Sequence, residues 1–388
     1  MTPRKTTIRF AAPVLALALL ALLSGSPAFA QILGIPLPPS GDNQYGSVTQ
    51  GIGPVRVTIT YSSPDVHAPN GEDRAGKIWG GLVPYGLSNA GFGTCGDQCP
   101  WRGGANENTT FATTHDLKVQ GSALKAGTYG LHFIPGKEDW TVVFSKVNDA
   151  WGSFFYDVKD DALRVQAKPE KNEYHEWLTY EFTDRQPDKA TVALMWENLK
   201  VPFTLGVENV ADLYVDGIRH SLRSTPGFNW QNWVAAAQYT LQAKSHLAEG
   251  LAWAEAASKP PIGQENFNTL ANLAQLQEAN GKAEEGAKTM DKAMALPTAT
   301  AADLHQYGRA LLGQGKKAEA VKVFELNAKR HPGEWPTPVG LARALSAQGK
   351  IKEALEAAKA GLKLAPNDQA RSSLEALIKT LEQGKDIN

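Results

Sequence analysis

Hydrophobic and polar residues alternate with a period of two through the first half of the chain. In VRVTITYS, for example, single polar residues separate the hydrophobic side chains from Val55 to Tyr61. This alternation is typical of a strand with one buried face. Similar short runs follow between turn-forming segments, in TYGLHFIP, WTVVFS, ALRVQAK, WLTYEFTD, TVALMWE and VPFTLGV. Because no helical pattern interrupts them, we predict that residues 50–208 form an all-β antiparallel sandwich or barrel.

The second half of the chain has a helical pattern that repeats. Three glycines recur at a constant interval of 34 residues, namely Gly281, Gly315 and Gly349. A helical hairpin of this period is typical of tetratricopeptide repeats, and residues 230–388 resemble that all-α family. Leu270, Leu304 and Phe324 are expected to fill the space between successive hairpins. Such arrays present a concave surface, so the resemblance implies docking of a protein partner.

The first thirty residues follow a third pattern. Basic residues precede an apolar run at positions 11–23, and SGSPAFA with its small residues follows. This order predicts a secretory signal peptide that is cleaved after Ala30, and the run is too short to span a membrane. Residues 31–49 are then expected to be a flexible segment. Residues 209–229 are expected to be a linker, because RSTPGFNW contains helix and strand breakers where the composition changes.

The net charge of the chain and its predicted export indicate which kinds of partner to expect. The chain contains 39 basic and 40 acidic residues, so its net charge is close to zero. A protein that binds nucleic acid or an anionic membrane surface would need a basic excess, and we therefore expect neither partner. The signal peptide predicts a periplasmic or secreted protein, and this environment favours disulfide formation.

Both cysteines of the chain lie in one loop, CGDQCPWRGGANENTTF. Three residues separate Cys95 from Cys99, and Gly96 gives the intervening segment the flexibility to close. In an oxidising compartment, this spacing favours a local disulfide. A redox pair has two intervening residues more often, and a metal site would need two further ligands, so these two interpretations are weaker.

Several motifs in the first half carry a family resemblance. VTITYSSPDVH, KIWGGLVPYG, WRGGANENTTF, LKAGTYGLHFIPG and ATVALMWENLKVPF occur in that order. Together they resemble the bacterial domain-of-unknown-function family 2911 over residues 53–205. The resemblance implies an all-β fold and export, and it implies no particular activity or cofactor. The chain departs from the family pattern where residues 87–100, with both cysteines, separate VPYG from tryptophan-arginine.

Polar and aromatic residues of these motifs lie in loops, where binding sites are usually built. The candidate ligand-binding residues are Ser62, Asp65, His67, Trp79, Tyr85, Trp101, Arg102, Asn106 and Glu107. The guanidinium of Arg102 suits a carboxylate or phosphate, and the aromatic rings suit a sugar or another ring. In the alternative interpretation, Arg102 pairs with Glu107 or Asp65 and only braces the loop.

Three hypotheses for function follow. We favour a periplasmic or secreted adaptor, in which the β domain binds a small polar ligand and the repeats bind a protein. The second hypothesis is a metal-assisted hydrolase, in which His67, His115 and His132 converge with Glu107. The third is a purely structural envelope protein. Binding is favoured over catalysis, so no catalytic residue, metal ligand or cofactor is assigned.

Overall fold

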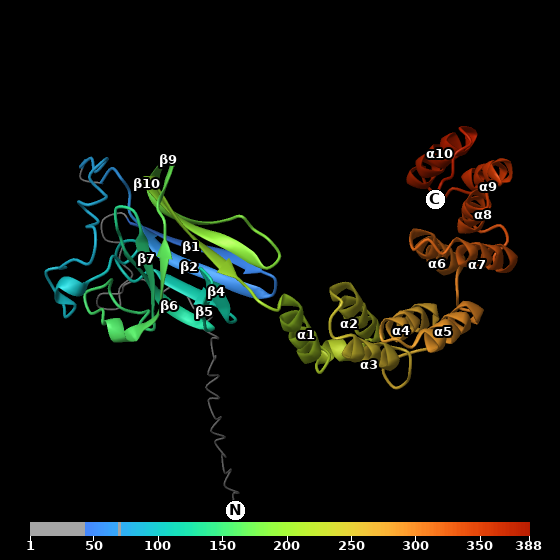
Figure 1. Ribbon diagram of the computed structural model, residues 1–388, viewed down its shortest axis with the longest axis horizontal. Coiled ribbons are helices and arrows are strands. Elements are labelled where there is room, and N and C mark those ends of the chain that lie inside the picture. The colour runs from blue at the N-terminus through green and yellow to red at the C-terminus, as the bar shows by residue number, and fades with distance from the viewer. Residues whose placement is uncertain (1–42, 69–70) are drawn as a thin grey trace, which may run out of the picture. The chain divides into compact units, whose positions relative to one another are not determined.

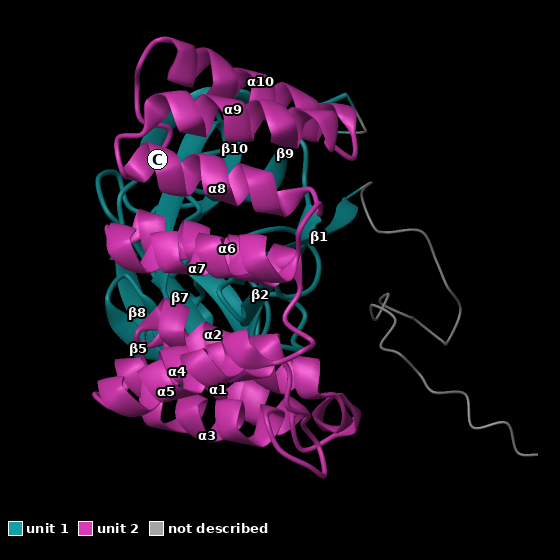
Figure 2. Ribbon diagram, turned by 90° about the vertical axis from the view of Figure 1, so that its right-hand side faces the viewer, with its two compact units in different colours: residues 1–208 teal, residues 209–388 magenta. Residues whose placement is uncertain are grey.

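The computed structural model describes residues 43–68 and 71–388. The expected signal peptide and the expected cleavage point after Ala30 lie outside these residues. The chain divides into two compact units between Glu208 and Asn209 (Figure 2). Unit 1 is built from strands and unit 2 from helices.

Unit 1 consists of two antiparallel sheets (Figure 1). The larger sheet has the order β1–β2–β3–β6–β7–β8, with β1 at Gln44–Ile52, β2 at Val55–Ser63, β3 at Thr110–Thr113, β6 at Gly127–Ile134, β7 at Trp140–Ser145 and β8 at Asp161–Ala167. The smaller sheet has the order β5–β4–β10–β9, with β4 at Leu117–Val119, β5 at Ser122–Leu124, β9 at Glu170–Thr183 and β10 at Lys189–Gly206. The prediction of an antiparallel all-β domain is confirmed.

The two sheets pack face to face around an aromatic core. Tyr61 on β2 contacts Tyr180 on β9, with 4.9 Å between the ring centroids. Phe144 on β7 lies 6.2 Å from Phe203 on β10. The alternating residues of β2 explain this arrangement, because Val57 and its hydrophobic neighbours are fully buried between the sheets. Of the two predicted architectures, the structure is therefore the sandwich.

Two predicted boundaries in unit 1 are wrong. Residues 44–49, expected to be flexible, belong to β1, which pairs with β2 along its whole length. This strand is mostly exposed and lacks the hydrophobic alternation that reveals a strand in sequence. TVALMWE and VPFTLGV belong to the single strand β10. Between them the strand has a bulge at Glu197, whose φ is 52°. After this bulge, Leu199 and Lys200 pair again with β9.

Unit 2 is a series of helices that pair as antiparallel hairpins. They are α1 at Val210–Ser221, α2 at Trp230–Ala243, α3 at Leu247–Ala257, α4 at Phe267–Ala279, α5 at Ala283–Ala295, α6 at Ala301–Gly313, α7 at Lys317–Arg330, α8 at Pro336–Ala347, α9 at Ile351–Lys363 and α10 at Asp368–Glu382. The predicted helical repeat is confirmed. Within the described residues, no helix is long and apolar enough to cross a membrane.

The repeating glycines end the first helix of three hairpins. Gly281, Gly315 and Gly349 follow α4, α6 and α8 with φ between 75° and 79°. This left-handed conformation lets the next backbone amide fold back to the helix, as when the Lys282 amide donates to the Gln277 carbonyl oxygen at 2.8 Å. The interval of 34 residues therefore marks the turn within each hairpin.

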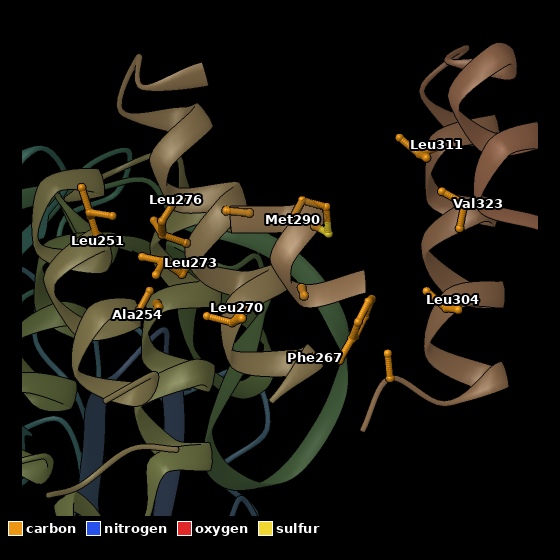
Figure 3. Close-up of a cluster of buried hydrophobic side chains, with 14 of the residues drawn as sticks. Leu251, Ala254, Phe267, Leu270, Leu273, Leu276, Met290, Leu304, Leu311 and Val323 are labelled. Atoms are coloured by element: carbon orange, nitrogen blue, oxygen red, sulfur yellow. The ribbon is translucent and has the colours of Figure 1, made fainter. Parts of the chain in front are cut away.

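One hydrophobic cluster of unit 2 runs from α1 to α8, and a second, smaller cluster joins α8, α9 and α10. Leu270, Leu304 and Phe324 are all buried in one cluster, and Figure 3 shows Leu270 and Leu304 on successive hairpins. The segment 209–229, expected to be a linker, instead contains α1 and a short 3-10 helix at Thr225–Phe228. Val215 and Leu222 bury their side chains in the same cluster, so packing against the repeats stabilises this helix.

Candidate functional site

A pocket of about 550 Å³ lies among the loops between β2 and β3. Trp101, Arg102 and Asn106 contribute to its wall from one loop, Arg74 from another, and Trp196 from β10. Three of the nine candidate residues therefore lie on one cavity. The pocket combines charged groups with aromatic rings, which is the usual composition of a small-molecule site.

Arg102 carries a charge that no carboxylate neutralises within the part of the chain that the structure describes. Its Nη1 donates a hydrogen bond to the backbone oxygen of Asn106 at 2.6 Å. The guanidinium carbon lies 5.0 Å from the centre of the Phe154 ring. Burial lowers the pKa of Arg102, because desolvation disfavours the charged form. A half-buried charge without an ion pair is costly to the fold, so this arginine has capacity left for an anion.

The disulfide loop supports Arg102 through Phe154. Cys95 and Cys99 form the predicted disulfide. The backbone amides of Thr94 and Cys95 both donate to the carbonyl oxygen of Phe154, at 2.8 and 3.2 Å. The loop therefore holds the segment whose aromatic ring covers the Arg102 guanidinium. The departure from the family pattern at residues 87–100 thus supports the segment that packs on Arg102.

Four tryptophans form a cluster beside the pocket, and they are Trp79, Trp101, Trp140 and Trp196. The ring centroids of Trp101 and Trp196 are 6.4 Å apart and their planes differ by 13°. Trp79 packs edge-on against Trp101 at 5.9 Å. Aromatic rings that pack against one another lose little freedom on binding. Trp79, expected in the site, therefore supports the two rings that reach the pocket.

Most other candidate residues surround the pocket without lining it. Ser62 donates a hydrogen bond to Glu107 at 3.4 Å, and neither residue lies on the cavity wall. Asn106 adopts a left-handed conformation with a φ of 57°, and this conformation shapes the loop. Tyr85 is 41% exposed and lies outside the pocket lining. The expected pairing of Arg102 with Glu107 or Asp65 does not occur among the described residues.

Asp65 and His67 belong to a polar network beside the middle of β9. Asp65 lies 3.8 Å from Arg74, and His67 shares a hydrogen bond of 2.8 Å with Glu176. This hydrogen bond raises the pKa of His67. Desolvation opposes ionisation of Glu176, yet hydrogen bonds from Tyr174 and His67 lower its pKa to about 2. The charged pair therefore fastens the loop after β2 to β9, at the rim of the pocket.

The three histidines of the hydrolase hypothesis do not converge. His67 faces Glu176, and His115 bonds to the neighbouring threonine hydroxyl. His132 is buried on β6 and shares a hydrogen bond of 2.9 Å with Ser153. Among residues 43–68 and 71–388, no group of three or more histidine, cysteine, aspartate or glutamate side chains could hold a metal ion. The convergence of these histidines with Glu107 is therefore wrong, because their strands and loops face different parts of the sandwich.

Trp196 and Phe154 were not predicted in this region, and His132 was considered only in the metal-site hypothesis. Trp196 lines the pocket from β10, and Phe154 covers Arg102 from a loop after β7. His132 lies close enough to feel the positive charge of Arg102, and burial with this charge lowers the pKa of His132 to about 4. These residues stand far from Arg102 in sequence, so no local spacing could indicate their proximity.

Unit 2 has a groove of about 470 Å³ along α2, α4 and α6. Its lining is rich in amide side chains and contains Trp230, Phe267 and Tyr307, but neither lysine nor arginine. Asn272 on α4 lies in this groove and is 3% exposed. Neither its amide nitrogen nor its amide oxygen has a hydrogen-bond partner among the described residues. Such an unsatisfied amide is rare in folded proteins.

The fold and these two sites define a class of protein: a β-sandwich with a loop-walled pocket, followed by helical hairpin repeats with an open groove. Residues 43–205 match the family model described as "Protein of unknown function (DUF2911)". Residues 311–378 match a model described as "Tetratricopeptide repeat". Both resemblances inferred from the sequence are confirmed, and the repeats suggest a role in protein–protein interaction.

No curated protein matches the chain, and the solved structures that resemble it do so at low sequence identity. A tetratricopeptide repeat protein from Parabacteroides merdae is 14% identical, with a TM-score of 0.30, over 46% of this chain and 70% of that one. YrrB, described as a TPR protein with an unusual peptide-binding site, is 15% identical, with a TM-score of 0.27, over 43% of this chain and 89% of that one. Nearly identical TPR-like repeats from Podosopora anserina are 19% identical, with a TM-score of 0.30, over 40% of this chain and 85% of that one.

Proposed function

We propose that this protein is an exported adaptor with two binding surfaces. The helical repeats hold an extended segment of a protein partner in the groove along α2, α4 and α6. The β unit holds a small polar ligand in the pocket beside Arg102. The observation that carries the proposal is the unpaired Asn272 amide in the groove, because a folded chain without a partner gains nothing from burying it.

The lining of the groove suits a peptide backbone. Asparagine and glutamine side chains each donate and accept hydrogen bonds, as the amides of an extended segment also do. Gln231, Gln238, Asn268 and Gln275 accompany Asn272 along the groove. Without a lysine or arginine, the lining has no cation with which to select the terminal carboxylate of a partner. We therefore expect recognition of an internal segment with an uncharged stretch and an apolar anchor for the aromatic residues.

Selection from a displayed library of random peptides, with the full chain as bait, tests the groove. A photo-crosslinking amino acid in place of Gln275 should capture the selected peptides, because this exposed position lies on the groove. The same amino acid in place of Lys288, which is exposed on α5, is the matched control. Capture from position 288 alone, or no selected sequence at all, would contradict the proposed groove.

Export rests on the pattern of the first thirty residues. We expect the protein from a bacterial envelope fraction to begin at Gln31, because the small residues before this position form the cleavage signal. N-terminal sequencing of the mature protein measures this directly. A chain that retains Met1 and stays in the cytoplasmic fraction would refute export, and the disulfide loop would then face a reducing environment.

A further inference from the structure

We propose that the pocket beside Arg102 binds a small organic monocarboxylate whose flat apolar body lies against Trp101, with Trp196 packed behind it. This inference rests on the proposed function of the β unit as a ligand-binding module and names the chemical class of its ligand. It depends on three observations: the charge balance of the pocket, its aromatic wall and its volume.

Of the two guanidinium groups that line the pocket, one is left without an ion pair in the part of the chain that the structure describes. Arg102 has no ion pair among the described residues, and its single hydrogen bond goes to the backbone of Asn106. Arg74 also lines the pocket, but Asp65 and Glu72 each lie 3.8 Å from its guanidinium. These two carboxylates already pair with Arg74, so the guanidinium left for an anionic ligand is that of Arg102. One guanidinium fork matches one carboxylate, and the two carboxylates beside Arg74 would repel the second charge of a dianion such as a phosphate monoester.

The guanidinium itself is held in place for this contact. Phe154 covers it at 5.0 Å, and a side chain at Gly152 would come within 2.3 Å of its central carbon. One nitrogen already donates to the Asn106 carbonyl oxygen, and the other donors of the planar fork remain. A carboxylate matches such a fork with two parallel hydrogen bonds. Because little side-chain freedom remains to be lost, the contact costs less entropy than one made by a mobile surface arginine.

Much of the remaining lining of the pocket is apolar. Trp101 and Trp196 stack nearly parallel, and Pro64, Leu82 and Val83 line the same cavity. Its volume of about 550 Å³ lies within the range of about 300–1,000 Å³ that is usual for sites of drug-sized ligands. An anion as small as acetate would leave this wall without a partner. The ligand should therefore carry a ring or a similarly flat body next to its carboxylate.

Calorimetric titration of the full chain with matched probes tests the inference. The probes are 2-naphthoate, its neutral counterpart 2-naphthamide, and 2-naphthyl phosphate. We expect 2-naphthoate to bind at least about tenfold more tightly than either of the others, since charge-assisted hydrogen bonds exceed neutral ones. The variant Arg102→Gln should abolish this preference. Arg56→Gln, at an exposed position on β2, should retain it.

The variants also distinguish failure of the carboxylate assignment from failure of ligand binding as such. Far-UV circular dichroism shows whether Arg102→Gln stays folded, and Trp101→Ala provides an independent test of the aromatic wall. Equal binding of naphthoate and naphthamide, lost in Trp101→Ala, would overturn the carboxylate assignment and leave the ligand-binding function standing. Tighter binding of naphthyl phosphate would overturn the monoanion in favour of a phosphate ester. If none of the three probes binds, both the inference and the proposed function of this pocket fail.

Discussion

Replacing Phe324 with alanine should lower the free energy of unfolding of the helical unit by about 3–5 kcal/mol. The Phe324 ring is fully buried. It lies so close to Gly308 and Gly340 that a side chain at either glycine would come within 2.6 Å of the ring. The ring therefore fills the space between α6 and α8, which belong to successive hairpins. Urea unfolding of the full chain, followed by circular dichroism at 222 nm, measures the loss.

The chain offers a matched control for this substitution. Phe228 lies in the same unit but is 87% exposed. Phe228→Ala removes the same atoms from solvent rather than from the core, so its effect should stay within about 0.5 kcal/mol. Equal losses from the two substitutions would mean that the hairpins do not share a continuous core. The predicted packing between repeats would then be incorrect.

The repeats could be predicted because their signals are local. Gly281, Gly315 and Gly349 each mark a turn that needs a left-handed residue, and the spacing between them is the length of one hairpin. The same holds for β2, whose buried residues alternate with less buried ones over most of the strand. Local periodicity reports burial wherever an element packs one face on a core.

The missed elements lack such a local signal. β1 is an edge strand whose side chains are mostly exposed, so its hydrogen bonds to β2 alone specify it. β10 continues past the bulge at Glu197 because its polar residues still pair with β9. Helix α1 ends beside the segment of breakers, and its position depends on Val215 and Leu222, which pack against the repeats. In each case, contacts that are distant in sequence override the local pattern.

In the candidate site, too, the features carried by one short segment were predicted, and those that depend on distant segments were not. Trp101, Arg102 and Asn106 were predicted together and do line one pocket, because a single short loop carries them. The sequence could not show that Arg102 stays unpaired or that Trp196 completes the wall. Both facts depend on how β10 and the loop after β7 meet that segment. The metal-site hypothesis required three histidines to converge, and each of them instead has a different partner in the structure.

Replacing Asn272 with leucine should stabilise the helical unit and weaken the binding of peptides in its groove. The Asn272 side chain is 3% exposed, and both of its polar atoms lack a hydrogen-bond partner among the described residues. An unsatisfied buried polar group costs about 1–3 kcal/mol, and leucine has a similar volume without that cost. We expect the free energy of unfolding to rise by about 1–2 kcal/mol. Peptides selected on the full chain should bind at least about tenfold more weakly, since the amide no longer bonds their backbone.

The test is informative because the substitution should raise the stability of the unit and lower its affinity for peptides at the same time. A residue that serves only the fold should lose stability when it is replaced, and binding should fall only as far as the fold is lost. Gln275→Leu is the matched control for stability, because this amide lines the same groove but is exposed to solvent. It should leave the free energy of unfolding nearly unchanged. Two results would contradict the proposal: destabilisation of the unit by Asn272→Leu, or unchanged affinity of the variant for the selected peptides. Either result would mean that the buried amide does not bind a partner, and the main observation in favour of a peptide-binding groove would be lost.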